Sequence, residues 1–212
     1  RKVFLIGHSL GGLVSYAGAP YLDGAIAGIA SIGSPYHFTR GSASLAAIAA
    51  FVRMARWLDI KPNPSVTMKP LGFTMSALRR FAESPLYPIP LRGWHKGAVE
   101  PQVLAEHLKL AFDRAGLAEL VDMFDWANEK RFGGVDSDAT ERFESMDVPL
   151  LVVAGTNDDL APPASVRPGF IKSRSTDKTY RALPLGHIDL LVGRDAPLST
   201  WPMIAAWLDK RA

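Results

Sequence analysis

Apolar positions near the start of the chain follow first a strand pattern and then a helix pattern. Residues 2–6 form a short, mostly apolar run that is typical of a buried strand. From Leu10 to Ala17 apolar residues recur every three or four positions until Pro20, which predicts a helix. The apolar segment 25–32 ends at a Gly-Ser-Pro sequence and predicts a second strand closed by a loop.

The middle of the chain, from residue 37 to 145, has helical spacing and few strand signals. Four helices are predicted there, over residues 44–58, 74–82, 103–115 and 117–131. A proline-rich connector in this region, expected to be irregular or polyproline-like, contains Pro62, Pro64, Pro70, Pro85, Pro88 and Pro90. We interpret residues 37–145 as an α-helical insertion.

After Pro149 strands and helices alternate again. The pattern predicts strands over residues 150–154 and 178–183, with a short helix over residues 163–171 between them. Ser199 or Thr200 is expected to cap a last helix, whose apolar face carries Ile204, Trp207 and Leu208. Strands separated by helices imply a parallel sheet covered on both faces, so we predict an α/β fold with about four strands.

Length and composition limit the class of protein. A chain of 212 residues has room for one domain of ordinary size, and its 48% apolar and 21% charged residues are typical of a folded core. No apolar run approaches the roughly 20 residues that cross a bilayer. The formal net charge of +3 is too small to predict nucleic-acid binding.

The absence of cysteine excludes disulfides and thiolate-bound metal sites, although it does not fix the compartment. The five histidines lack the spacing of metal ligands and no phosphate-cradling glycine loop occurs, so we expect neither a metal nor a cofactor. The chain starts at Arg1, directly before a buried strand. We therefore expect further residues to precede it in a longer protein, where any targeting segment would lie.

The sequence Gly7-His8-Ser9-Leu10-Gly11 fits Gly-x-Ser-x-Gly and lies between the first predicted strand and helix. A serine at so sharp a turn needs small neighbours, because Gly7 and Gly11 let backbone pass close without a clash with a Cβ atom. The N-terminal amides of the helix would point toward Ser9, so the Leu10 N–H is a candidate oxyanion donor. The structural alternative is a glycine-rich turn with a capping serine.

A serine nucleophile needs a histidine base and an acid that orients the histidine. His187 is the candidate base, because it follows the last predicted strand at the sheet edge where sites of open α/β folds form. His8 belongs to the turn itself and is expected to point away from the position of a base. His95 and His107 lie in the insertion and are expected at the surface.

The candidate acid lies in the loop after the strand over residues 150–154. Asp158, three positions past the glycine that ends this strand, is preferred, with Asp159 in reserve. Residues 31–40, which follow the second strand, contain no Asp or Glu and offer no alternative.

The chain order Ser9, Asp158, His187 resembles the α/β-hydrolase superfamily. Residues 33–37 (Gly-Ser-Pro-Tyr-His) are similar to the Gly-Thr-Pro-His segment of many lipases. Residues 186–190 (Gly-His-Ile-Asp-Leu) are similar to the histidine loop of lysophospholipase-like and polyhydroxyalkanoate-synthase-like members. The resemblance implies the C-terminal part of this fold, with a core of residues 1–36 and 146–212 and a helical cap of residues 37–145.

Two departures from the superfamily bear on activity. In the superfamily several strands precede the turn that carries the nucleophile, which is called the nucleophile elbow, whereas only eight residues precede Ser9 here. The loop that supplies the second oxyanion donor is therefore expected to be missing from the chain. We therefore expect this chain alone to be impaired, and its first strand to form an exposed, aggregation-prone sheet edge. Polyhydroxyalkanoate synthases carry cysteine at the elbow, so Ser9 favours hydrolysis over polymerisation.

The resemblance implies a serine hydrolase of lipophilic carboxylic esters: Ser9 attacks the carbonyl, His187 moves the proton and Asp158 fixes the imidazole tautomer. A small-molecule ester is the expected partner. An acyltransferase or thioesterase on the same scaffold is one alternative. A non-catalytic, hydrolase-like binding module is another, and it would be favoured if the three side chains did not meet.

The insertion carries large apolar side chains, most of which are expected to pack it onto the sheet while a minority line an acyl pocket. They include Phe51, Met54, Trp57, Met75, Phe81 and Trp126. Residues 53–96 hold eight basic and two acidic residues. This segment is a solvated face by default, and the alternative is attraction to an anionic lipid interface.

Overall fold

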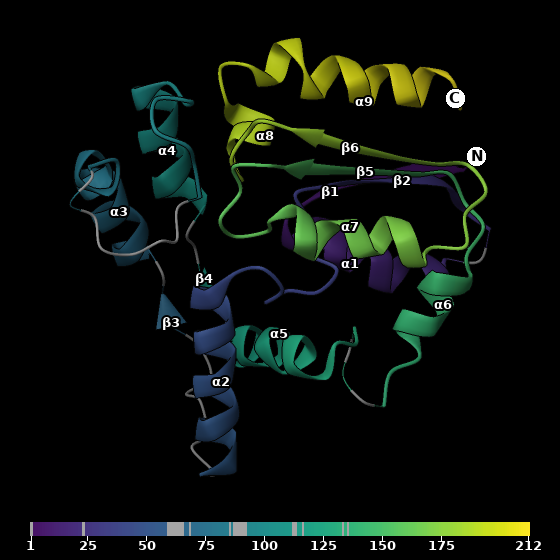
Figure 1. Cartoon of the computed structure of the whole chain (residues 1–212), viewed down its shortest axis with the longest axis horizontal. Coiled ribbons are helices and arrows are strands. Elements are labelled where there is room, and N and C mark those ends of the chain that lie inside the picture. Colours follow the sequence, from purple (N-terminus) through teal and green to yellow (C-terminus); the bar gives the residue numbers. More distant parts are fainter. Residues whose placement is uncertain are drawn as a thin grey trace.

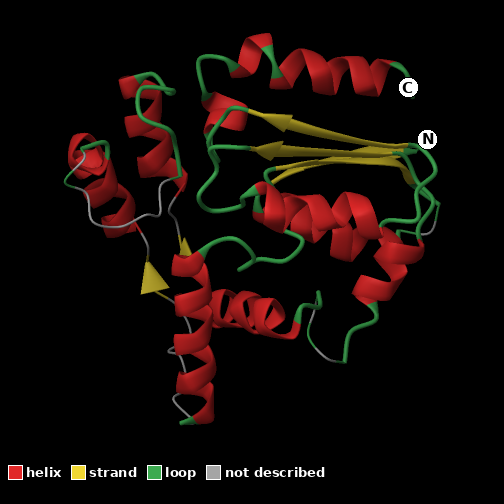
Figure 2. Ribbon diagram, viewed as in Figure 1, coloured by secondary structure: helices red, strands yellow, loops and turns green. Residues whose placement is uncertain are grey.

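The computed structural model describes residues 2–22, 24–58, 66–67, 69–84, 86, 93–111, 114–115, 117–132, 134 and 136–212. Figures 1 and 2 show a layered core built on one sheet, with a group of helices beside it. Among the described residues, no helix is both long enough and apolar enough to span a membrane.

Four parallel strands form the sheet, in the order β1-β2-β5-β6. They are β1 (Val3–His8), β2 (Ile26–Ile32), β5 (Leu150–Gly155) and β6 (Lys178–Leu183). The predicted α/β class and number of strands are confirmed. Because parallel strands all run the same way, their carboxyl ends lie at one edge, and the loops that follow them come together there.

One face of the sheet is covered by α1 (Leu10–Gly18), α6 (Ala139–Ser145) and α7 (Pro163–Lys172), as Figure 1 shows. A short 3₁₀ turn, Ala19–Tyr21, follows α1. Side chains alternate between the two faces of a strand, so every second residue of β5 points to this side. The apolar cluster on this face includes Tyr16, Ile29, Phe143, Leu150, Val152 and Val166.

The opposite face is covered by α9 (Thr200–Asp209), which follows the short α8 (Asp189–Val192) and a 3₁₀ turn, Ala196–Leu198. Its apolar cluster includes Ala30, Ile32, Leu151, Val153, Leu190 and Trp207. The contact between α9 and the sheet is close, because a Cβ atom on Gly28 would lie 2.8 Å from the Trp207 ring.

Residues 37–145, the predicted insertion, contain the four helices that the sequence predicts, with shifted ends, and also α6, which packs on the core. The four predicted helices are α2 (Ala43–Trp57), α3 (Lys69–Ala82), α4 (Pro101–Ala111) and α5 (Leu117–Glu129), and two short strands, β3 (Val66–Thr67) and β4 (Arg114–Ala115), pair antiparallel. Pro70 lies in the first turn of α3 and not in an irregular connector, because a helix tolerates a missing N–H there. The other five connector prolines lie outside the described residues.

Several apolar side chains of the insertion do not pack on the sheet as expected. Met54, Trp57 and Phe81 are 50%, 83% and 48% exposed, and α2 extends away from the sheet while it packs against α5 (Figure 1). Met75 packs within the insertion, and Trp126 packs against the core cluster of the α1 face. The side chain of Phe51 is outside the described part of the chain.

β1 lies at an edge of the described sheet and exposes apolar side chains. Val3 and Ile6 are 51% and 52% exposed, and β1 pairs with β2 on its other side. A strand edge of this kind offers unpaired backbone groups to other chains. The expected aggregation stays a prediction, and this edge is the surface on which it rests.

Candidate active site

Ser9 lies at the turn between β1 and α1, in a backbone conformation that residues with a side chain rarely adopt. Its φ is 53° and its ψ is −124°. The Ser9 N–H donates to the Ile32 carbonyl at 3.0 Å, and the Ser9 carbonyl accepts the Gly12 N–H at 3.1 Å. Such strain costs about 1–3 kcal/mol and persists only where the surroundings hold it in place.

Two glycines make this turn possible. A Cβ atom on Gly7 would lie 2.4 Å from the backbone of Gly11, and one on Gly12 would lie 2.0 Å from the Ser34 Oγ. A Cβ atom on Gly11 would meet nothing within 4 Å. The expectation that Gly11 must lack a side chain is therefore wrong, and the steric requirement rests on Gly7 and Gly12.

We expect Gly7→Ala to lower the free energy of unfolding by about 3 kcal/mol or more, because the new methyl group would overlap rigid backbone. Gly11→Ala is its matched control and should change stability by less than about 1 kcal/mol, since alanine suits an open helical position. Urea denaturation measures both. Equal stability of the two variants would contradict the close approach at Gly7.

His187 connects Ser9 to Asp158. Its Nε2 lies 2.8 Å from the Ser9 Oγ, and its Nδ1 lies 2.7 Å from Asp158 Oδ2. A carboxylate only accepts hydrogen bonds, so Nδ1 carries the proton and Nε2 is left to accept the Ser9 hydroxyl. His187 and Asp158 are only 5% and 3% exposed, which shields this chain of bonds from water.

Asp158 is itself held by the loop after β5. Its Oδ1 accepts the backbone N–H groups of Leu160 at 2.9 Å and Ala161 at 2.7 Å, so its other oxygen faces His187. The structure thus brings together Ser9, Asp158 and His187. The reserve candidate, Asp159, is not the carboxylate bonded to His187.

His8 lies against His187, and the expectation that it points away is wrong. Its Nε2 donates to the His187 carbonyl at 2.9 Å, and the two ring centroids are 4.7 Å apart. Burial, together with the neighbouring His187, lowers the pKa of His8 from 6.5 to about 4. The motif gave no sign of this contact, because it joins residues 179 positions apart.

The lowered pKa of His8 predicts a loss of stability in acid. As the pH falls below 6.5 the unfolded chain takes up this proton first, so the free energy of unfolding decreases until the pH reaches about 4. The loss specific to His8 should be about 3 kcal/mol. Urea denaturation of the wild type and of His8→Gln between pH 7 and 4 measures it. Parallel pH curves for the two proteins would refute the assignment.

The histidine bonded to the Ser9 hydroxyl is His187, and the three that remain besides His8 have different surroundings. His95 is exposed as expected, whereas His107 is half-buried rather than solvated, and burial lowers its pKa. It belongs to α4, and its charge acts on His8 and lowers the pKa of His8 slightly further, so His107 lies near the His8–His187 pair. His37 follows β2 and is half-buried, and burial lowers its pKa as well.

The Leu10 backbone N–H, the candidate oxyanion donor, begins α1. The first amides of a helix have no carbonyl partner within the helix, so this position leaves an N–H available to an oxygen bound at Ser9. Among the described residues, no group of three His, Asp or Glu is arranged as a metal site.

A model of the family described as "Alpha/beta hydrolase family" matches residues 1–197. The chain belongs to the alpha/beta hydrolase family. Among curated proteins, none matches the chain significantly.

Solved alpha/beta hydrolase structures resemble this one at low sequence identity. The monoacylglycerol lipase of Paleococcus ferrophilus is 20% identical with a TM-score of 0.64, and the match covers 100% of this chain and 70% of that one. A thermophilic esterase from Thermogutta terrifontis is 17% identical with a TM-score of 0.59, covering 99% and 65%. The enol-lactonase from Burkholderia xenovorans LB400 is 19% identical with a TM-score of 0.52, covering 98% and 66%. These likenesses show the fold, and the chain spans about two thirds of the length of such proteins.

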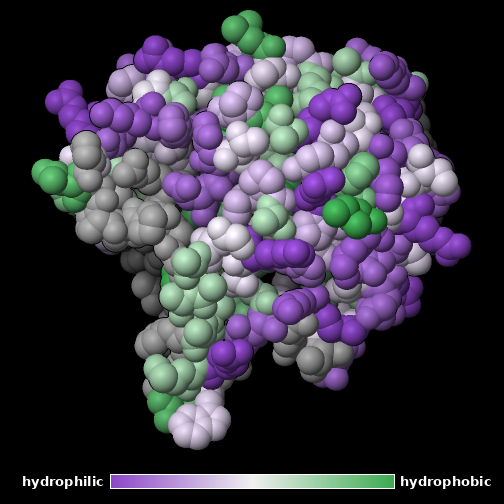
Figure 3. Space-filling model, viewed as in Figure 1, coloured by the Kyte–Doolittle hydropathy of each residue, from purple (hydrophilic) through white to green (hydrophobic). Residues whose placement is uncertain are grey.

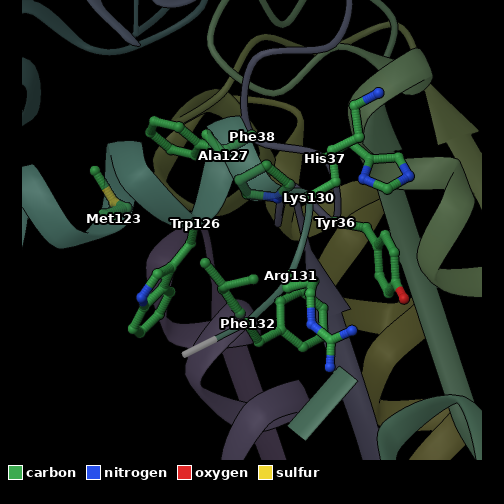
Figure 4. A pocket seen from close by; sticks show the side chains of 11 residues that line it. Tyr36, His37, Phe38, Met123, Trp126, Ala127, Lys130, Arg131 and Phe132 are labelled. Carbon is green, nitrogen blue, oxygen red and sulfur yellow. The ribbon is translucent and has the colours of Figure 1, made fainter. Parts of the chain in front are cut away.

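A pocket of the hydrolase fold lies between α5 and the loop that follows β2 (Figure 4). It is lined mainly by apolar and aromatic side chains: Leu13, Pro35, Tyr36, His37, Phe38, Met123, Trp126, Ala127, Lys130, Arg131 and Phe132. Its volume is about 10 Å³, and Ser9, Asp158 and His187 are not among its lining residues. Of the large apolar residues singled out in residues 37–145, Trp126 is among those that line it.

Proposed function

We propose that this alpha/beta hydrolase cleaves carboxylic esters with Ser9 as nucleophile, His187 as general base and Asp158 as the acid that orients His187. The observation that carries the proposal is the unbroken run of hydrogen bonds from the Ser9 hydroxyl through both His187 nitrogens to Asp158. The strained conformation of Ser9 supports it, because strain of this kind collects at functional sites.

The bonds suggest a reaction in two halves. The Ser9 oxygen attacks the ester carbonyl while its proton passes to His187 Nε2, and the imidazolium then gives that proton to the leaving alcohol. Water attacks the resulting acyl-enzyme, again losing a proton to Nε2, and the proton returns to Ser9 as the acid leaves. The Leu10 N–H would stabilise the oxyanion in each half.

The proposed substrate has an apolar acyl chain, because the helices of residues 37–145 carry many large apolar side chains. The pocket of Figure 4 does not hold this chain, since its volume of about 10 Å³ suits a single water molecule and Ser9 is not among its lining residues. We further propose that residues 37–145 form a cap over a core of residues 1–36 and 146–212.

A panel of p-nitrophenyl esters tests this function in the full-length protein. We expect kcat/KM to rise from acetate to medium-chain esters. Preference for acetate would contradict an apolar acyl chain in the substrate. Product analysis with an added alcohol or thiol acceptor separates hydrolysis from acyl transfer.

We also propose that the exposed apolar side chains of the insertion meet an anionic lipid interface. Figure 3 shows apolar surface along α2, where Met54 and Trp57 are 50% and 83% exposed. Two exposed cations, Arg53 of α2 and Arg80 of α3, would favour contact with an anionic surface. Binding to anionic vesicles that weakens with salt would support this surface, and equal binding to uncharged vesicles would contradict it.

A further inference from the structure

The residue after His187 is bound to the helical insertion. The Ile188 N–H donates to the Gly93 carbonyl at 2.8 Å. The Ile188 side chain is 8% exposed and belongs to the apolar cluster of the insertion, which contains Trp94, Val99, Leu104 and Leu108. The chain that carries the proposed base is therefore part of the packing of α4 and residues 93–99.

The residue before His187 is held by Asp189. One oxygen of this carboxylate, Oδ2, accepts hydrogen bonds from two backbone N–H groups, that of Gly186 at 2.9 Å and that of His95 at 2.8 Å. The approach is close enough to require glycine, because a Cβ atom on Gly186 would lie 2.5 Å from the same oxygen. A single carboxylate oxygen thus joins the loop of His187 to the insertion.

Burying the Asp189 carboxylate costs free energy that an apolar side chain in the same place would not cost. The residue is fully buried, and its Oδ1 has no hydrogen-bond partner among the described residues. Burial raises the pKa of the Asp189 carboxyl, and the charge of Asp158 acts in the same direction, whereas His95 and the two backbone donors oppose it. An apolar residue would fill this space at lower cost, so the acceptor oxygen is the feature that the site uses.

We propose that Asp189 is a positioning residue that fixes His187 at Ser9 by tying the His187 loop to residues 93–95 of the insertion. The inference rests on the proposed role of His187 as the base. Displacement of a reacting group by about 1 Å can cost 10²-fold in rate, so loss of the tie should act on catalysis more than on substrate binding.

The tie predicts a particular order among variants of Asp189. We expect Asp189→Ala to lower kcat for ester hydrolysis by about 10- to 100-fold and to change KM by less than about threefold. Asp189→Asn keeps an acceptor oxygen of the same shape and should restore kcat to within about threefold of the wild type. Asp189→Leu fills the space without an acceptor and should behave as Asp189→Ala does.

Arg194→Gln is the matched control. The ion pair of Arg194 with Glu100, at 3.0 Å, also joins the chain after α8 to the insertion, but both side chains are about half exposed and neither takes part in the two hydrogen bonds by which Asp189 ties the His187 loop to the insertion. Exposed pairs of this kind contribute little to stability, so the variant should keep kcat within about twofold. A loss of activity equal to that of Asp189→Ala would mean that any link between the segments matters, which would overturn the specific role of Asp189.

A readout that needs no substrate keeps this inference separate from the proposed function. The His187 Nδ1–H that donates to Asp158 should give a downfield proton resonance in the wild type and in Asp189→Asn. It should be weakened or lost in Asp189→Ala and Asp189→Leu samples that still unfold cooperatively. The proposal would be overturned if Asp189→Ala and Asp189→Leu kept both the wild-type resonance and the wild-type kcat. It would also be overturned if Asp189→Asn were as impaired as Asp189→Ala. Absence of any Ser9-dependent turnover in the wild type would instead count against the proposed function.

Discussion

Ser9→Ala should lower kcat for a p-nitrophenyl ester by about 10⁴- to 10⁶-fold in the full-length protein, the largest effect that we expect of any substitution. The hydroxyl is the atom that would form the acyl-enzyme, and alanine leaves His187 with nothing to deprotonate at that point. KM should change little, because Ser9 would contribute to the transition state rather than to binding.

Stability provides the control for this variant. The strained φ of 53° at Ser9 is retained by the surrounding hydrogen bonds of its backbone, which alanine keeps. The variant should therefore unfold within about 1 kcal/mol of the wild type. Turnover that survives the substitution in a folded protein would remove Ser9 from the mechanism and leave another nucleophile to be found.

Asp158→Asn should lower kcat by about 10⁴-fold. The amide has nearly the same shape, but its NH₂ group in place of Oδ2 would favour the imidazole tautomer with the proton on Nε2. That tautomer cannot accept the Ser9 proton. Initial-rate measurements over pH 6–9 would show the loss at every pH, because the fault is the wrong tautomer of His187 rather than a titration.

The neighbouring carboxylate offers a matched comparison. Asp159→Asn makes the same chemical change one position away, at a residue that is not the partner of His187. We expect its kcat to stay within about threefold of the wild type. If Asp159→Asn were the inactive variant and Asp158→Asn the active one, the acid would be misassigned.

The sequence predicted the sheet well for physical reasons. β5 and β6 are short apolar or alternating runs between turn signals, and β6 begins and ends at the predicted residues. Parallel topology then placed the loops after β1, β5 and β6 at one edge. This is why Ser9, Asp158 and His187 could be selected from loops far apart in the chain.

Other elements gave too short a signal. α6 and α8 have seven and four residues, which is too few for a helical period to repeat. β3 and β4 have two residues each, and their pairing depends on segments distant in sequence. The sequence also could not predict that apolar side chains of α2 are exposed. Periodicity identifies the apolar face of a helix but does not show which element, if any, packs against it.

The site itself contains two features that the motif could not reveal. His8 was set aside because it belongs to the elbow, yet its ring lies against His187. Asp189 was noted as part of the histidine loop, but its bond to the His95 N–H requires the insertion to fold back onto α8. Both contacts depend on how loops approach in three dimensions, and local spacing contains no record of that approach.

Covalent labelling tests the central claim most directly. A fluorophosphonate should modify Ser9 of the wild type, found as a single adduct on the peptide that contains it by mass spectrometry, and should react far more slowly with His187→Ala. An adduct on a different residue, or equal labelling of Ser9 with and without the His187 imidazole, would contradict the assignment of Ser9 as a nucleophile activated by His187.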